Sequence, residues 1–223
     1  MKELTSNSGH FLVLEGPDGS GKTTQLHLLR THLISQGYDV VVAREPGGTK
    51  WGMKIREIFL EGQGELDPMA EVMLLLAAKA QVLREVILPA YNSGKIVLMD
   101  RYTDSLLAYQ GGGRQLGFRR LKETVQAAEL HFPPTFTVFI DTPFRVCLER
   151  IRQRPSSENN KLDLESEAYQ RRVHQAYQEI IDDAQVTDRP HCTISGLLTQ
   201  QEMHQQIVEQ LKIGGVTEIR LRD

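Results

Sequence analysis

A glycine-rich segment lying between an apolar run and an amphipathic run constrains the fold of this chain more than any other feature. Residues 16–23 read GPDGSGKT, which matches the pattern G-x-x-x-x-G-K-[ST]. The apolar run HFLVLE at 10–15 comes directly before it, and residues 22–36, with leucines at helical spacing, follow directly. In a strand–loop–helix context, such a loop directs backbone N–H groups and a helix N-terminus at phosphate oxygens. The segment therefore predicts a nucleoside triphosphate site.

The side chains of this loop indicate individual roles. We expect Lys22 to reach the β- and γ-phosphates and the Thr23 hydroxyl to bind Mg²⁺. The residues expected at the phosphates of ATP are Gly16, Pro17, Asp18, Gly19, Ser20, Gly21, Lys22, Thr23 and Thr24. The loop by itself leaves open whether the γ-phosphate goes to water, as in a switch GTPase or ATPase, or to a small acceptor.

Five short apolar runs rich in β-branched residues alternate with helix-length segments. They are HFLVLE (10–15), YDVVVA (38–43), KIVLMD (95–100), FTVFID (136–141) and CTIS (192–195). Continuous apolarity is typical of parallel strands that are covered on both faces. The pattern predicts an α/β fold with a doubly wound parallel sheet, whose ligands bind at the carboxyl ends of the strands. A length of 223 residues suits one domain, 1–223.

One helix and one loop can be predicted in more detail. Asp67 followed by Pro68 is typical of an N-cap and first helical residue, and opens a long helix that runs toward Pro89. Gly111 to Gly113 are expected either to hinge a loop or to form a flexible surface loop.

Composition narrows the class of partner. A formal net charge of −3 provides no basic field for binding long nucleic acid. The N-terminus lacks a signal-peptide apolar region, and the longest apolar stretch, 72–78, is too short to span a bilayer. The two cysteines, Cys147 and Cys192, lie far apart and are expected to be buried thiols, as in a reducing compartment. We therefore expect a cytoplasmic protein that does not bind membranes.

Residues 160–163 spell NKLD, the guanine-recognition motif of switch GTPases. That motif has to follow a buried strand, whereas here the preceding residues, RQRPSSEN, are polar and interrupted by proline. The D-x-x-G element of GTPases is also missing, because Asp100 is followed by RYTD. A GTPase is thus disfavoured, and the polar stretch 154–161 with its flanks favours a lid.

Three further stretches, taken with the phosphate loop, resemble the thymidylate kinase family. They are REPGGT (44–49), DRYTDS (100–105) and AYQGGGR (108–114), in the family's order between about residue 10 and about residue 200. The resemblance implies a five-stranded parallel sheet with a mobile lid, here about residues 150–165. It also implies Mg²⁺-dependent transfer of the γ-phosphate of ATP to dTMP, giving dTDP and ADP. Members of the family are usually homodimers, so we expect a homodimer.

Chemistry and resemblance together assign the acceptor side. Asp100 ends a strand, where a carboxylate can hold Mg²⁺ opposite Thr23, although it could also be only a helix cap. Arg101 suits bidentate capture of a phosphate dianion. The residues expected to be catalytic in the loop and at this strand end are Lys22, Arg101 and Asp18. The residues expected to bind dTMP are Asp18, Glu45, Pro46, Arg56, Leu75, Lys79, Arg101, Ser105, Tyr109 and Gln110.

The resemblance gives some of these residues a specific place. It places Arg56 at the monophosphate, Tyr109 near the sugar, Ser105 near the base and Asp18 at the 3′-hydroxyl or the metal. A solvated helix-surface arginine remains the alternative for Arg56, and a purely structural turn is the alternative for 45–48.

The chain departs from the family pattern at two places. Leu75 and Lys79 stand where the family usually has a phenylalanine that stacks on thymine and an arginine that bonds it, so a kinase for dUMP, another nucleoside monophosphate or a deoxynucleoside stays open. The phosphate loop also lacks the arginine of some members, which moves the expected catalytic cation to the lid. Its candidates are Arg150, Arg152, Arg154 and Lys161. Arg154 is the favoured catalytic residue, and Arg150 the favoured residue for stacking on adenine.

Overall fold

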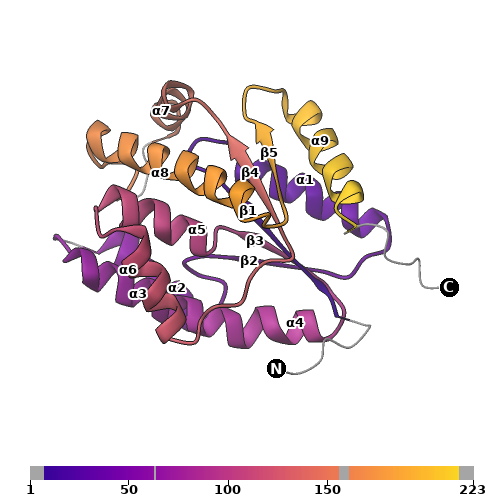
Figure 1. Cartoon of the computed structure of the whole chain (residues 1–223), viewed down its shortest axis with the longest axis horizontal. Coiled ribbons are helices and arrows are strands. Elements are labelled where there is room, and N and C mark those ends of the chain that lie inside the picture. The colour runs from indigo at the N-terminus through magenta and orange to yellow at the C-terminus, as the bar shows by residue number, and fades with distance from the viewer. Residues whose placement is uncertain (1–7, 63, 156–160, 216–223) are drawn as a thin grey trace.

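The computed structural model describes residues 8–62, 64–155 and 161–215, which form a parallel sheet with helices on both faces (Figure 1). The sheet has the order β2-β3-β1-β4-β5. Its strands are β1 (His10–Glu15), β2 (Val40–Arg44), β3 (Ile96–Asp100), β4 (Phe136–Asp141) and β5 (His191–Ser195). The predicted fold class is confirmed, and each predicted strand lies within two residues of its observed bounds.

Helices connect successive strands, and α9 follows the last strand near the end of the described residues. They are α1 (Lys22–Ser35), α2 (Lys50–Glu61), α3 (Pro68–Val82), α4 (Leu88–Asn92), α5 (Thr103–Leu106), α6 (Phe118–Ala127), α7 (Phe144–Arg152), α8 (Glu167–Val186) and α9 (Gln200–Ile213). Two π-helical segments, η1 (Leu83–Ile87) and η2 (Leu107–Gly113), continue α3 and α5. Across the described residues, no helix combines the length and apolarity that crossing a membrane requires.

The two faces of β1 supply separate parts of the core. Leu12 and Leu14 pack with α1 and α9, whereas Phe11 and Val13 pack on the opposite face with η1 and α4. Alternate residues of a strand point to opposite faces, so a strand buried on both faces must be apolar throughout. This explains why the strands of this chain read as continuous apolar runs.

The long helix begins as predicted but continues beyond its predicted end. The Asp67 carboxylate accepts the backbone N–H of Met69 at 2.8 Å, which confirms the cap. Pro89 lies inside the helical rod, near the start of α4, and η1 comes directly before it. A π-turn departs from the ordinary i→i+4 pattern, so it accommodates a residue that has no N–H to donate.

The expectation that Gly111 to Gly113 form a hinge or surface loop is wrong. These glycines belong to the helical segment η2, which packs against α8. A Cβ placed on Gly112 would lie 2.5 Å from the Cβ of Ala176, and one on Gly113 would lie 2.7 Å from the Tyr169 ring. The glycines let two helices approach closely.

This contact yields a prediction about stability. Gly112→Ala should lower the free energy of unfolding by about 1–3 kcal/mol, because the added methyl group overpacks the contact with Ala176. Urea denaturation of the purified protein measures the effect. Adding Ala176→Gly restores the space, so the double variant should show a favourable coupling energy between the two positions. Strictly additive effects would contradict the proposed steric contact.

Candidate active site

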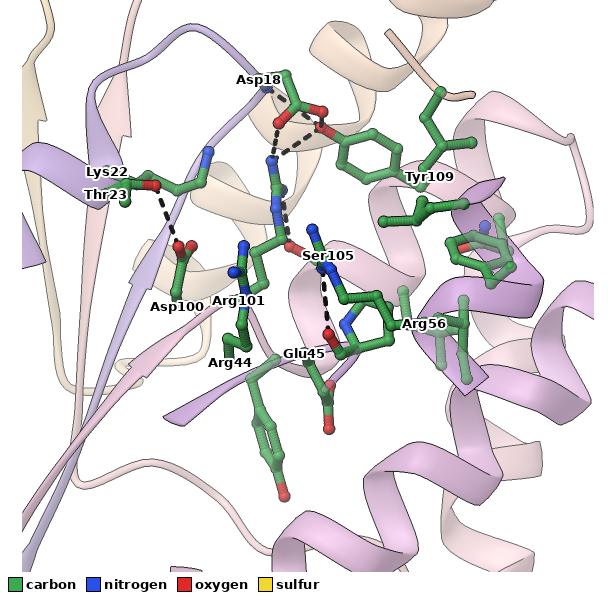
Figure 2. A pocket seen from close by; sticks show the side chains of 18 of the residues that line it. Asp18, Lys22, Thr23, Arg44, Glu45, Arg56, Asp100, Arg101, Ser105 and Tyr109 are labelled. Carbon is green, nitrogen blue, oxygen red and sulfur yellow. Dashed lines mark hydrogen bonds and ion pairs between the residues drawn. The ribbon is translucent and has the colours of Figure 1, made fainter. Parts of the chain in front are cut away.

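A cavity of 510 Å³ opens at the carboxyl edge of the sheet, where the phosphate loop, β2 and β3 end (Figure 2). Its walls also include side chains of α2, α3 and η2. The predicted site residues that line it are Asp18, Gly19, Gly21, Lys22, Thr23, Thr24, Glu45, Pro46, Arg56, Leu75, Lys79, Asp100, Arg101, Ser105, Tyr109, Gln110 and Arg154. Segments that lie far apart in the sequence therefore meet around one space.

The phosphate loop has the backbone that its glycines predict. Gly16, Gly19 and Gly21 have φ values of 145°, 80° and 103°, which side-chain-bearing residues rarely adopt. Lys22 is buried at the foot of the loop and donates to the carbonyl oxygen of Pro17 at 2.7 Å. Burial lowers the pKa of Lys22 to about 8, aided by the nearby charge of Arg101. The ammonium is therefore held where it lacks full hydration.

Thr23 and Asp100 meet across the start of α1 and the end of β3. The Thr23 hydroxyl donates to Oδ2 of Asp100 at 3.1 Å. Both groups offer oxygen ligands of the kind Mg²⁺ prefers, and this ion commonly takes its remaining ligands from water and nucleotide phosphates. Within the described part of the chain, no three His, Cys, Asp or Glu side chains gather as a metal cluster. The pair fits an ion that shares its coordination with a substrate.

Arg101 is the most highly connected side chain of the site. It has a left-handed backbone with φ 69°, and its side chain is 16% exposed. Nη1 donates at 3.1 Å to Gly16 O, Ser105 Oγ and Tyr177 Oη. Nη2 donates to Oδ1 of Asp18 at 2.5 Å and to Tyr109 Oη at 3.1 Å. The guanidinium is thus fixed by four segments of the chain.

Asp18 faces both Arg101 and Tyr109 (Figure 2). The Tyr109 hydroxyl donates to Oδ2 of Asp18 at 2.6 Å. Burial by itself raises the pKa of the Asp18 carboxyl, but the charges of Arg101 and Lys22 outweigh it and hold that pKa below its usual range. Asp18 is consequently an ionised acceptor within the phosphate loop.

Two arginines that follow β2 enlarge the cationic wall. Arg56, on α2, donates to the carbonyl oxygen of Pro46 at 3.1 Å and lines the cavity, so it is not a freely solvated surface arginine. Burial and the nearby Arg44 lower the pKa of Arg56. Arg44 lines the same cavity. Arg44 was predicted only as the first residue of the REPGGT stretch, with no role of its own. Its position directly after an apolar run was the signal that it would lie at the carboxyl edge of the sheet.

The far end of the cavity holds a buried ion pair. Nζ of Lys79 lies 3.0 Å from Oε2 of Glu45 and 3.2 Å from the centre of the Tyr102 ring. Burial lowers the pKa of Lys79 and raises that of Glu45, and each charge opposes the shift of the other. Leu75 is half-buried beside them and also packs against the core. Lys79 is therefore a cavity residue whose charge is neutralised within the protein.

Gln110 also lines the cavity and is fully buried. Its Nε2 donates to Oε2 of Glu71 at 3.2 Å. Glu71 also accepts from Arg114 at 2.9 Å and 3.0 Å. The sequence offered no signal for Glu71, because one acidic residue on an amphipathic helix resembles any other.

The structure separates the lid cations by position. Arg154 lines the cavity, 3.9 Å from Oδ2 of Asp163. Arg150 donates instead to the backbone oxygens of Gly19 and Gly196, at 3.2 Å and 2.9 Å. Lys161 Nζ donates to Gly64 O at 2.8 Å, and Arg152 is exposed. Part of the predicted lid, including the first residue of NKLD, lies outside the described residues.

Two residues that contact the Arg101 network were not predicted. Glu15 ends β1 and Tyr177 lies on α8, and both are buried. An acidic residue at the end of an apolar run was a usable signal for Glu15, because a buried carboxylate needs partners. No local signal identifies Tyr177, which reaches the site only through the packing of α8.

Comparison with known proteins places this arrangement in a family. The family model described as thymidylate kinase matches residues 14–207. A thymidylate kinase of Thermoanaerobacter sp. (strain X514) is 37% identical over 205 residues, covering 92% of this chain and 98% of that protein. One from Limosilactobacillus fermentum is 43% identical over 172 residues, covering 76% and 80%. The crystal structure of thymidylate kinase from Ehrlichia chaffeensis superposes with a TM-score of 0.71 at 28% identity, covering 92% and 99%.

The Lys79–Glu45 pair gives a prediction that does not depend on activity. Lys79→Met should lower the free energy of unfolding by about 3–5 kcal/mol at neutral pH, because it leaves a buried carboxylate without its cation. Acidification protonates Glu45, so the deficit relative to the parent should shrink at low pH. Urea denaturation at two pH values measures both effects. The control is Lys79→Met with Glu45→Gln, and an equal loss in single and double variants would contradict the pairing.

Proposed function

We propose, from the premise that this chain belongs to the thymidylate kinase family, that it transfers the γ-phosphate of ATP to the 5′-phosphate of dTMP. The products are ADP and dTDP, and the reaction serves dTTP synthesis. One observation carries the proposal: Lys22 and Arg101 both line the same cavity. Lys22 lies at the foot of the phosphate loop, and Arg101 directly follows β3. One cation serves the donor and the other serves the acceptor.

Catalysis then consists of alignment and charge compensation. Two phosphate groups that approach each other repel, so cations must surround the space between them. Lys22, Arg101 and Arg56 provide that charge from three different elements. The acceptor is already an anion, so no general base has to remove a proton from it. The chain supplies position rather than a covalent intermediate.

The acceptor nucleoside lies along the remaining wall. Asp18 and Tyr109 are assigned to the sugar, and their 2.6 Å hydrogen bond supports a joint role. Ser105, Gln110, Leu75 and Lys79 are assigned to the base side, with Glu45 and Pro46 forming the adjoining turn. Lys79 is paired with Glu45, so its ammonium is less available to bond thymine. A related acceptor such as dUMP therefore remains the second candidate.

Thr23 and Asp100 would hold Mg²⁺, which supplies charge neutralisation for the β- and γ-phosphates when bound. Their 3.1 Å contact and their oxygen chemistry support this assignment.

We assign residues of about 150–165 to a lid within one domain that spans 1–223. Arg154, which lines the cavity, would stabilise charge on the transferred phosphoryl group. Arg150, bonded to the phosphate loop and to Gly196 after β5, borders the side where adenine would stack. Closure of such a segment over both substrates keeps water away from the γ-phosphate.

We also infer a homodimer in the cytoplasm. Trp51 and Ile58, two turns apart on α2, and Met73 on α3 are 58%, 53% and 53% exposed. Large exposed apolar side chains on neighbouring helices support an interface between copies of the chain. Cys147 and Cys192 are free and buried, which supports a reducing compartment.

Acceptor specificity tests the proposed function. ADP release from ATP is measured with dTMP, dUMP, dCMP, thymidine or no acceptor, in the presence of Mg²⁺. We expect the highest kcat/KM with dTMP and little turnover without an acceptor. Equal turnover with and without acceptor would contradict a kinase, whereas preference for another nucleotide or a nucleoside would contradict only the dTMP assignment.

Arg154→Ala tests the lid cation. Its kcat should fall by about 10²–10³, with dTMP affinity little changed, because the lost charge acts in the transition state. Steady-state kinetics and dTMP titration measure the two quantities. Arg152→Ala is the matched control, since that arginine is exposed and does not line the cavity. A raised KM for dTMP with unchanged kcat would make Arg154 a binding residue instead.

A further inference from the structure

We infer that Glu15 is a positioning residue for phosphoryl transfer: its carboxylate orients the hydroxyls of Ser105 and Tyr177 so that both accept from Arg101. The inference deepens the proposed function, because it rests on Arg101 binding the acceptor phosphate. Glu15 acts through these hydroxyls and does not line the cavity.

The carboxylate of Glu15 is fully buried and accepts four hydrogen bonds. Oε1 accepts the backbone N–H groups of Tyr102 and Ser105, at 2.7 Å and 3.2 Å. Oε2 accepts the Ser105 hydroxyl at 2.7 Å and the Tyr177 hydroxyl at 3.1 Å. Oε1 therefore binds backbone N–H groups at the start of α5, and Oε2 binds two side-chain hydroxyl groups.

The number of protons sets the direction of these bonds. Each hydroxyl has one hydrogen and two acceptor lone pairs. When the hydrogens of Ser105 and Tyr177 point to Oε2, their lone pairs remain for Nη1 of Arg101, which lies 3.1 Å from each oxygen. The hydroxyls themselves lie 2.8 Å apart, so reversing one of them disturbs the other. Burial raises the pKa of Glu15, whereas the charge of Arg101 and the hydrogen bonds from Ser105 and Tyr102 favour the ionised form. In that form Glu15 can only accept, so both hydroxyls present lone pairs to Arg101.

The same strand end also fixes the backbone around Arg101. The backbone N–H of Arg101 donates to Leu14 O at 3.1 Å, one residue before Glu15, and Gly16 O, one residue after it, accepts from Nη1. All three acceptors of Nη1 therefore depend on residues 15 and 16 or on groups that Glu15 holds. This arrangement leaves Nη2 to face Asp18, Tyr109 and the cavity.

Glu15→Gln reverses the polarity of one arm while keeping the size of the side chain. Its amide oxygen can still accept the two backbone N–H groups, but its NH₂ would face two hydroxyls and turn their hydrogens toward Arg101. We expect kcat/KM for dTMP to fall about tenfold to a hundredfold, with the KM for ATP within about twofold of the parent. The free energy of unfolding should fall by less than the activation free energy that corresponds to this loss of kcat/KM.

A second readout is independent of the acceptor. NMR of protein labelled with ¹⁵N-arginine, with Arg101 assigned by its absence in Arg101→Lys, reports rotation of the guanidinium. Slow rotation is expected in the parent and faster rotation in Glu15→Gln. An unchanged rotation rate would overturn the inference even if dTMP were not the acceptor. Absence of dTMP phosphorylation by the parent would overturn the proposed function alone.

Asp104→Asn is the matched control. Asp104 lies on α5 next to Ser105, is 6% exposed and pairs with Arg189 at 3.0 Å. Its charge raises the pKa of Glu15, so Asp104→Asn removes a buried acid of α5 while favouring the ionised form of Glu15 and leaving the two hydroxyls in place. A similar loss for dTMP in Asp104→Asn, or a parallel rise in the KM for ATP in Glu15→Gln, would show that Glu15 only supports the fold.

Tyr177→Phe completes a double-mutant cycle with Glu15→Gln. It removes one hydroxyl, so the further loss caused by Glu15→Gln should be smaller in that background, and full additivity would overturn the inference. Were Glu15→Gln not to fold, Tyr177→Phe combined with Ser105→Ala would remove both hydroxyls and leave Glu15 in place. That variant should speed Arg101 rotation, and unchanged rotation would again overturn the inference.

Discussion

The largely desolvated guanidinium of Arg101 is the constraint on which the rest of the site depends. A cation removed from water needs several acceptors, and here they come from the phosphate loop, α5, η2 and α8. Each of these segments supplies an acceptor, so a shift of any one of them changes the hydrogen bonds of the guanidinium. The order of the strands serves this requirement, because Leu14 pairs with Asp100 in adjacent strands and so places residue 101 directly beside the loop.

Asp18 makes this concentration of charge tolerable before substrates bind. It lies 2.5 Å from Arg101, and its ionised form is stabilised by that arginine and by Lys22. In the proposed function, an acceptor phosphate that approaches Arg101 meets a cation whose Nη2 is already shared with a carboxylate. The hydroxyl of Tyr109, bonded to both groups, keeps their relative position fixed. The site is organised by its own charges before any nucleotide supplies more.

How much of this could be read from the sequence depended on the range of the interaction. The strands, the phosphate loop and the Asp67 cap were predictable, because each depends on neighbours within a few residues. The prediction for Gly112 was wrong, because this position is constrained by close packing against Ala176 on α8, far along the chain. Tyr177 was missed for the same cause, and Glu15 was overlooked because its partners lie about 90 residues or more along the chain. Family resemblance supplied Ser105 and Arg56, and for Arg56 the sequence alone left a solvated surface role open.

The two ends of the cavity differ in charge, and Lys79, the predicted departure from the family pattern, lies at the less charged end. Five cationic side chains and two carboxylates line the phosphate end: Lys22, Arg44, Arg56, Arg101 and Arg154, with Asp18 and Asp100. At the other end, Lys79 is neutralised by Glu45 and covered by Tyr102. A lysine is a compact point charge that one carboxylate can satisfy, whereas an arginine fork would keep donors for a ligand. In the proposed function this is the end assigned to the base, so Lys79 bears on base recognition and leaves the cationic end unchanged.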